Sequence, residues 1–227
     1  MPRAPRSAVL AGLVLIFGGV RAAPLARALI ASTAPGAGAS GQTASPPPSP
    51  AWTIDTANSS ATFAVRHMLV ATVRGQMGPV SGTVWYDGTN VASLRADATI
   101  DVRKLSTGDA DRDAHLRTPD FFAADQYPNM TFRSKRAVPK DAGHFQLIGD
   151  LTIRTTTKEV TLEVEGPLAA PTTSKERRLA ATATTTIDRF DYGLKWNGLI
   201  ETGGAMVGPD VKITIDLQVT RPAAPPR

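Results

Sequence analysis

Histidine and aspartate are the residues of this chain best suited to acid–base catalysis or metal binding, because the sequence contains no cysteine. Without cysteine there is no disulfide, no thiol nucleophile and no thiolate metal ligand. The three histidines are His67, His115 and His144. His144 follows Gly143 in an expected turn, where an exposed side chain without a functional role is predicted.

His115 has the spacing most typical of a catalytic group. It lies two residues after Asp113, and a histidine oriented by a carboxylate can act as a general base. No motif places a serine or another nucleophile beside this pair. The sequence therefore favours a structural network around His115 over a catalytic one.

The spacing Asp109-x-Asp111-x-Asp113 is typical of the start of a calcium-binding loop. Such loops need glycine at the sixth position and glutamate at the twelfth, whereas this chain has Ala114 and Asp120 there. Neither a metal site nor a cofactor is therefore predicted.

Alternation of apolar and polar residues is the dominant pattern between Trp52 and Thr220, and it predicts β-strands. Eight segments show the pattern: residues 61–67, 80–86, 94–103, 130–132, 145–153, 160–165, 179–187 and 211–219. Each has one apolar and one polar face, which excludes a parallel sheet covered on both sides. An antiparallel sandwich and a barrel remain, and the short turns favour an all-β, eight-stranded antiparallel up-and-down barrel.

Small residues on the apolar faces leave room inside such a barrel. They are Ala96, Ala98, Gly149, Ala181 and Ala183. An eight-stranded barrel is filled by its own side chains or holds one small ligand. The small residues favour a ligand, and the alternative is that large neighbours fill the space.

One segment, Asp109 to Arg117, interrupts the alternation and predicts a short helix in a long loop. Thr107 is the expected N-cap, and the aspartates of the first turns complement the helix dipole. The pair Phe121 and Phe122 follows and is expected to plug one end of the barrel.

The N-terminus predicts export. Arg3 and Arg6 precede 13 uncharged residues from Ala8 to Val20, and Ala26-Arg27-Ala28 resembles a cleavage site. We therefore predict a signal peptide at residues 1–28 and a periplasmic, cell-envelope or secreted protein. The apolar run is short for a spanning helix, and a retained N-terminal anchor is the alternative.

The remaining boundaries follow from composition. A Pro/Ser/Ala-rich linker is predicted at 29–51, the barrel domain at 52–220 and a disordered tail at 221–227. Removal of residues 1–28 takes away four arginines and lowers the formal net charge from +5 to +1. No basic surface for nucleic acid is then expected.

Five ordered blocks of the domain resemble a known family. The most specific runs from Thr107-Gly108 through Arg112-Asp113-Ala114-His115-Leu116-Arg117 and Asp120-Phe121-Phe122 to Tyr127-Pro128. The others start at Trp52, Val73, Gly149 and Ile187. They resemble the YceI-like, or polyisoprenoid-binding, proteins. Asn58, Met77 and Tyr192 depart from the residues common in that family, and Asn58 leaves no histidine at its position.

The resemblance implies a lipocalin-like barrel whose apolar tunnel binds an isoprenoid lipid, a polyprenyl phosphate or an isoprenoid quinone, for storage, transport or sensing. The expected lining residues are Phe63, Val65, Ala98, Ile100, Phe132, Leu147 and Leu162. His67, Arg112 and His115 are candidate polar groups at the mouth, and Phe121 and Phe122 a candidate lid. No enzymatic activity is expected.

Two other functions stay open. One is a hydrolase of lipid-like substrates that uses the His115 and Asp113 region. The other is a solidly packed barrel whose outer loops bind a partner. The sequence also leaves open a transient membrane contact and a homodimer.

Overall fold

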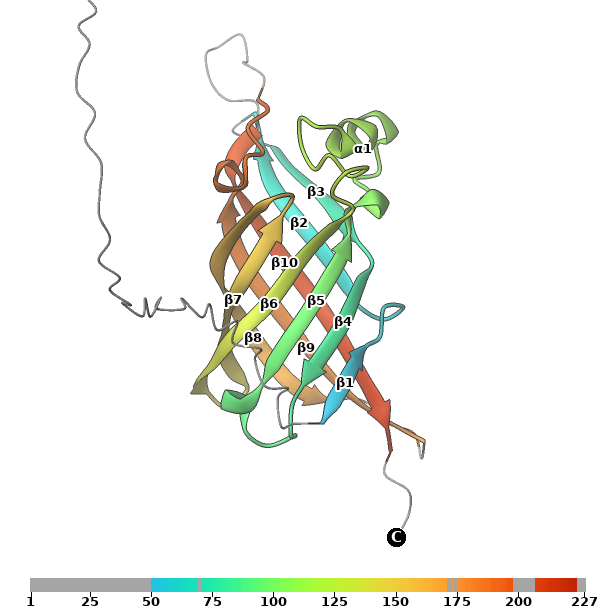
Figure 1. The fold of residues 1–227 in the computed structure, drawn as a ribbon, viewed down its shortest axis with the longest axis vertical. Coiled ribbons are helices and arrows are strands. Elements are labelled where there is room, and N and C mark those ends of the chain that lie inside the picture. Colours follow the sequence, from blue (N-terminus) through green and yellow to red (C-terminus); the bar gives the residue numbers. More distant parts are fainter. Residues whose placement is uncertain (1–49, 69–70, 171–172, 174, 198–206, 224–227) are drawn as a thin grey trace, which may run out of the picture. The chain divides into compact units, whose positions relative to one another are not determined.

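Ten strand segments form one antiparallel sheet that closes on itself (Figure 1). The computed structural model describes residues 50–68, 71–170, 173, 175–197 and 207–223. The predicted signal peptide and most of the predicted linker lie outside this part. The segments are β1 (Ala51–Ile54), β2 (Ser60–His67), β3 (Ala71–Gly78), β4 (Val80–Trp85), β5 (Arg95–Asp101), β6 (Asn129–Asp141), β7 (His144–Ile153), β8 (Thr156–Ala169), β9 (Glu176–Asp188) and β10 (Val207–Pro222).

The ten segments make eight strands, because two strands are each interrupted once. β1 pairs with β10 at Thr53–Thr220, and β2 follows on the same edge of β10 from Ser60–Asp216 onward. β4 pairs with β1 and β3 pairs with β2, so Pro79 merely interrupts one long strand. The eight strands then run up and down in chain order and close between β10 and β1–β2. The predicted eight-stranded barrel is confirmed.

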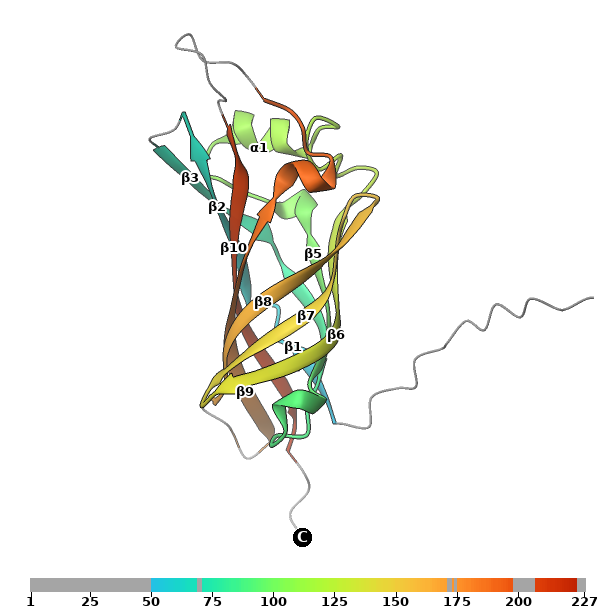
Figure 2. The ribbon, with the colours of Figure 1, turned by 90° about the vertical axis from the view of Figure 1, so that its left-hand side faces the viewer.

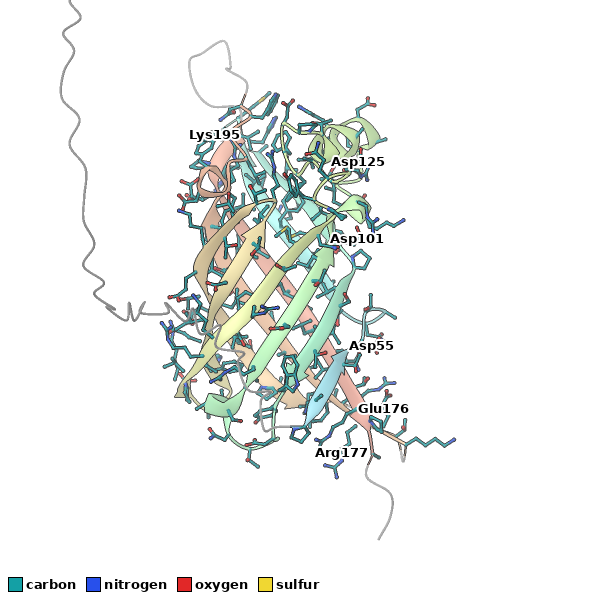
Figure 3. The ribbon with its side chains drawn as sticks, viewed as in Figure 1. Asp55, Asp101, Asp125, Glu176, Arg177 and Lys195 are labelled. Atoms are coloured by element: carbon teal, nitrogen blue, oxygen red, sulfur yellow. The ribbon has the colours of Figure 1, made fainter. Side chains whose placement is uncertain are left out.

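Alternation places the apolar side chains inside and the charged ones outside. On β7, for example, Phe145, Leu147 and Leu151 are buried. On the outer surface, Lys135 contacts Asp150 and Glu159 at 2.6 and 3.2 Å. Figure 3 shows charged side chains at the periphery of the barrel. Exposed ion pairs of this kind contribute about 0–1 kcal/mol each, so the apolar interior dominates stability.

Gly149 does not leave space for a ligand, contrary to the sequence-based expectation. A Cβ at this position would lie 2.7 Å from the Ser134 Cα and 2.8 Å from the Phe132 ring. The glycine allows the close approach of β6, which is irregular between Ser134 and Arg136. The other four small residues of that expectation, Ala96, Ala98, Ala181 and Ala183, do line the interior.

The single α-helix of the described residues, α1 (Ala110–Arg117), lies in the long connection between β5 and β6. Its N-cap is Asp109, whose carboxylate accepts from the Arg112 N–H at 3.0 Å. The prediction of Thr107 as the cap was wrong, because Thr107 lies three positions from the first helical residue and binds Asp113 instead. Figures 1 and 2 both place α1 at one end of the barrel, beside β2 and β3.

Short 3-10 turns complete the described part: η1 (Val91–Ser93), η2 (Val102–Lys104) and η3 (Arg189–Tyr192). None of the helices in the described ranges has the length and apolar character needed to cross a bilayer.

β10 continues through Arg221 and Pro222, two residues that the sequence assigns to a disordered tail. They pair with Arg177 and Glu176 of β9, and the Arg221 guanidinium lies 4.3 Å from the centre of the Trp52 ring. The cation–π contact holds the strand end in place. A proline at the last strand position removes little pairing, because only its own N–H is lacking.

Candidate functional site

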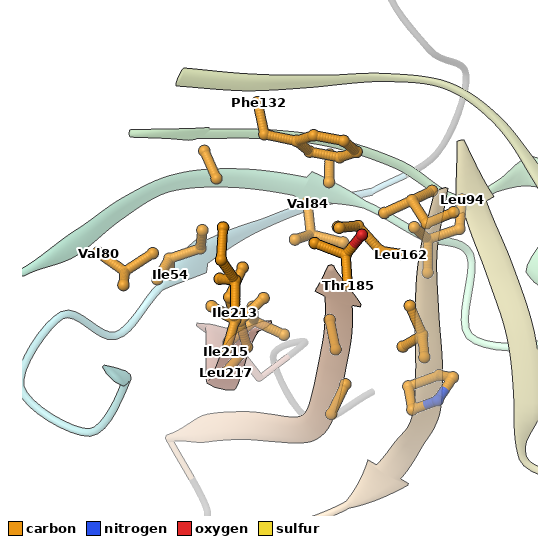
Figure 4. Close-up of a pocket in the computed structure, with 18 of the residues that line it drawn as sticks. Ile54, Val80, Val84, Leu94, Phe132, Leu162, Thr185, Ile213, Ile215 and Leu217 are labelled. Carbon is orange, nitrogen blue, oxygen red and sulfur yellow. The ribbon is translucent and has the colours of Figure 1, made fainter. Parts of the chain in front are cut away.

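Two apolar cavities lie inside the barrel in the part of the chain that the structure describes. The first, the inner cavity, has a volume of about 100 Å³. Figure 4 shows part of its lining, which includes Ile54, Val84, Leu94, Phe132, Leu162, Ile215 and Leu217. Apart from Tyr86, Thr131 and Thr185, the side chains that line it in the described structure carry no nitrogen or oxygen. This cavity can therefore hold hydrocarbon and offers little to a polar group.

The second, the mouth cavity, lies at the end of the barrel that carries α1 and has a volume of about 370 Å³. Its walls come from β2, β3 and β10, from α1 and the segment after it, and from η3. Phe63, Val65 and Val211 supply apolar surface, whereas His67 and Arg112 supply polar atoms. The interior is thus mainly apolar, with polar side chains at the end that carries α1.

All twelve residues that the sequence proposes as ligand contacts line one of these cavities. The mouth cavity contains Phe63, Val65, His67, Arg112, His115, Phe121 and Phe122. The inner cavity contains Ala98, Ile100, Phe132, Leu147 and Leu162. The sequence treats them as one tunnel, whereas the structure divides them between two spaces.

His115 belongs to an aromatic cluster at the mouth. Its ring meets Phe121 and Trp196 edge-on, with centroids 5.2 and 4.8 Å apart. Its Nε2 lies 3.0 Å from a carboxylate oxygen of Asp120. Edge-to-face contacts of this geometry stabilise a fixed ring orientation, so His115 shapes the rim of the cavity.

Asp113 does not orient His115. Its buried carboxylate accepts from the Thr107 N–H at 2.7 Å and from the Thr107 hydroxyl at 2.6 Å. Burial alone would raise the pKa of Asp113, but these hydrogen bonds and the Arg117 charge bring it below its usual value. Asp113 thus fixes the loop before α1, and the pair assumed by the hydrolase hypothesis is not formed.

Arg112 is engaged by the same loop. Its Nε donates to the Thr107 hydroxyl at 2.7 Å, and Nη2 donates to the Thr107 carbonyl at 3.2 Å. A weaker contact of 3.7 Å reaches the Asp109 carboxylate. Arg112 therefore lines the mouth cavity as part of the network that holds α1.

His67 is the polar side chain most available to a ligand. It lines the mouth cavity and is half-buried. Within the described residues its imidazole has no hydrogen-bond partner. Its ring nitrogens, which no described residue binds, can each donate to or accept from a ligand group.

Arg189, which is not among the predicted site residues, holds together the main chain on one side of the mouth. Its buried guanidinium donates to the carbonyls of Leu194 at 2.6 Å, Trp196 at 2.8 Å, Gly208 at 2.9 Å and Val207 at 3.0 Å. Burial lowers its pKa, and the charge of Asp188 opposes this. Arg189 thereby ties the chain before residues 198–206 to the chain after them and positions Trp196 against His115.

In the sequence, Arg189 belongs to the segment Ile187-Asp188-Arg189, which contributes to the family resemblance. Nothing in that segment indicates that the arginine binds main-chain carbonyls. Asn197 reinforces the same closure. Its side chain donates to the Val207 carbonyl and accepts from the Val207 N–H, both at 2.9 Å. Backbone acceptors leave no residue pattern in a sequence, so this clamp was not predictable.

Comparison with known proteins identifies relatives over the whole barrel. A family model described as the YceI-like domain matches residues 52–219. The UPF0312 protein SAS2572 of Staphylococcus aureus (strain MSSA476) is 35% identical over 162 residues, which cover 71% of this chain and 92% of the relative.

Solved structures show the same fold. BcnA of Burkholderia cenocepacia matches with a TM-score of 0.63 and 24% identity, over 73% of this chain and 98% of that chain. A structure described as a polyisoprenoid binding domain from Saccharophagus degradans matches with a TM-score of 0.54 and 15% identity, over 74% and 97% of the chains. At these identities the likeness concerns the barrel alone.

Proposed function

Because the chain belongs to the YceI-like domain family, we propose that its barrel binds an isoprenoid-type lipid, a polyprenyl phosphate or an isoprenoid quinone. The observation that carries the proposal is the apolar interior, which has polar side chains gathered at one end. A molecule with a long branched hydrocarbon and a single polar group has the matching form. The related fold from Saccharophagus degradans is described as binding polyisoprenoid, which supports this class of ligand.

The binding energy in this proposal comes from the hydrocarbon. Removal of apolar surface from water contributes about 25 cal/mol per Å², and the ordering of a flexible chain offsets part of it. The polar end of the lipid then lies at the mouth, where His67 offers a hydrogen bond. Orientation follows because the inner cavity would leave a polar end without partners.

Binding is favoured over the two other functions by particular contacts. A hydrolase that used His115 as its base would also need a nucleophile beside it, yet the described residues that line the mouth cavity include no serine or threonine. A solidly packed interaction module would have no interior space, whereas two cavities are present. Loss of turnover on His115→Ala with the fold intact would support the hydrolase instead.

We also propose that the protein acts in the cell envelope, after export directed by residues 1–28. The apolar run and cleavage pattern of the sequence support this. N-terminal sequencing of the protein from envelope and soluble fractions tests it. A mature chain that begins near Leu29 is the expected result, and an uncleaved chain retained in the membrane supports the anchor instead.

The direct test is mass spectrometry of the protein purified from its native envelope, under native and then denaturing conditions. We expect a stoichiometric additional mass that extracts into organic solvent as a polyprenyl or quinone species. A clean mass of the free protein, with no uptake of added isoprenoids, would contradict the proposed function.

A paired substitution tests whether the interior is the site. Ala183 lines the inner cavity and Thr184, the next residue, lies on the opposite face of β9. Ala183→Phe should reduce lipid uptake at least tenfold because its ring occupies the space for hydrocarbon, whereas Thr184→Phe should leave uptake unchanged. Circular dichroism shows whether both variants keep the barrel, and equal uptake by two folded variants would exclude the interior.

A further inference from the structure

The two cavities meet at one residue. Among the described lining residues, Ile213 of β10 is shared by the inner cavity and the mouth cavity. Its side chain is 3% exposed. The boundary between the two cavities therefore lies at Ile213.

A row of large buried side chains lies on the wall of the barrel opposite Ile213. Val80 pairs with Ile100 and Ile100 pairs with Met130, and Ile153 lies one residue beyond the Thr131–Thr152 pair. Val80, Met130 and Ile153 are each 2% exposed or less. In the eight-membered ring of strands, β6 with Met130 lies four places from β10 in either direction, so Met130 and Ile213 belong to opposing walls.

We infer that Ile213, with Met130 and Ile153 across the barrel, forms a waist that sets the length of hydrocarbon the protein accepts. This inference rests on the proposed function and makes it more specific. The mouth cavity is the larger space and carries the polar groups. A lipid fills it first, and only a chain longer than this cavity must displace the waist to reach the inner cavity.

The residue types at the waist suit this role. Isoleucine is branched at Cβ and is restricted about χ1, so Ile213 is the stiff side of the narrowing. Methionine is unbranched and adapts its shape easily, so Met130 is the side that yields. Resistance to long chains therefore depends mainly on the size of residue 213.

The experiment measures uptake of all-trans isoprenoid alcohols of increasing length, farnesol, geranylgeraniol and solanesol, by native mass spectrometry. Wild type is compared with Ile213→Ala, Ile213→Phe and the control Ile215→Ala. Ile215 is the next inward residue of β10 and lines the inner cavity alone. The control therefore removes the same atoms away from the waist.

We expect Ile213→Ala to raise uptake of solanesol relative to farnesol at least tenfold, and Ile213→Phe to lower that ratio. Ile215→Ala should keep the wild-type ratio. If Ile213→Ala fails to fold, Ile213→Val replaces it. This change removes one methylene and should raise the solanesol-to-farnesol ratio by a smaller factor.

Two results would overturn the inference, and they are distinguishable. Identical length profiles in wild type, Ile213→Phe and Ile213→Val show that lipid binds without passing a waist, while the proposed function survives. No uptake of any alcohol by the wild type removes the proposed function together with the waist.

Discussion

Tyr192 has a buried hydroxyl that, in the part of the chain the structure describes, lacks a hydrogen-bond partner. The side chain is 3% exposed. Burial, with a smaller contribution from Asp191, raises its pKa to about 12. A hydroxyl left without a partner in the interior destabilises the folded state by about 1–3 kcal/mol, and the family resemblance places a phenylalanine here.

We predict that Tyr192→Phe leaves stability at neutral pH unchanged or raises it by about 1 kcal/mol. Because the pKa of Tyr192 is higher in the folded than in the unfolded chain, its titration favours the folded state. This contribution to stability is complete below about pH 10 and is lost as the pH rises to about 12. The variant should therefore lose less stability than wild type in that range. Urea unfolding at neutral and alkaline pH measures both effects.

Tyr86 also has a pKa raised by burial and is present in both proteins, so the difference between them isolates Tyr192. Equal alkaline losses in wild type and variant would show that Tyr192 does not titrate differently on unfolding.

At the scale of elements, the helix and its loop were predicted more accurately than their contacts. Residues 109–117 have helix-forming residues and acidic residues at the start, and α1 forms there. The cap was misassigned because threonine and aspartate are both good caps, and only the backbone geometry at Asp109 decides between them. That the Asp113 carboxylate binds Thr107 depends on how the loop folds back onto the helix. No local sequence pattern indicates this contact.

β3 was missed for a different reason. Gly75 lies in its middle and has no side chain to contribute to an alternating pattern. A Cβ there would lie 2.7 Å from the Phe63 ring and 2.8 Å from the Ser106 carbonyl oxygen. A glycine is needed for this close approach. Because glycine has no side chain, it also interrupts the alternating pattern by which a strand is recognised in the sequence.

We predict that Asp113→Ala destabilises the loop before α1 and lowers the free energy of unfolding by about 1–3 kcal/mol, since two donors of Thr107 lose their acceptor. A lowered carboxyl pKa stabilises the fold above about pH 4, and this contribution is lost as the pH falls further. The difference between variant and wild type should thus shrink in acid. Hydrogen exchange of residues 105–117 and unfolding at two pH values test this.

Asp111→Ala is the matched control, because Asp111 is exposed on the same helix. Equal protection of the loop in both variants would show that Asp113 does not hold it.

At the scale of the whole molecule, closure of the barrel depends on the residues at the two ends of the domain. β1 joins β10 through two residue pairs, the Trp52 indole donates to the Tyr86 carbonyl at 2.9 Å, and Arg221 covers the indole. The alternation predicted antiparallel strands with one apolar face and left a sandwich or a barrel open, and the short turns between eight strands favoured the barrel that the structure shows. The division of the interior into two cavities was not predictable, since strand order and register alone place residues 130 and 213 on opposing walls.

We predict that a chain ending at Thr220 melts several degrees lower than the full chain, because it loses the Arg221 contact and the last pairs with β9. A chain ending at Ala223 retains them and should melt at the full-length temperature. Thermal unfolding followed by circular dichroism makes the comparison. A shared melting temperature for both truncations would mean that the seam closes without Arg221 and Pro222.

The clamp of Arg189 has a consequence for how this mouth can diversify. Arg189 contacts main-chain oxygens on both sides of residues 198–206, and such oxygens are supplied by any amino acid. The clamp therefore does not depend on which side chains stand at Leu194, Trp196 and Val207. These three residues line the mouth cavity, so their side chains can change the surface offered to a ligand while the acceptors of Arg189 stay in place.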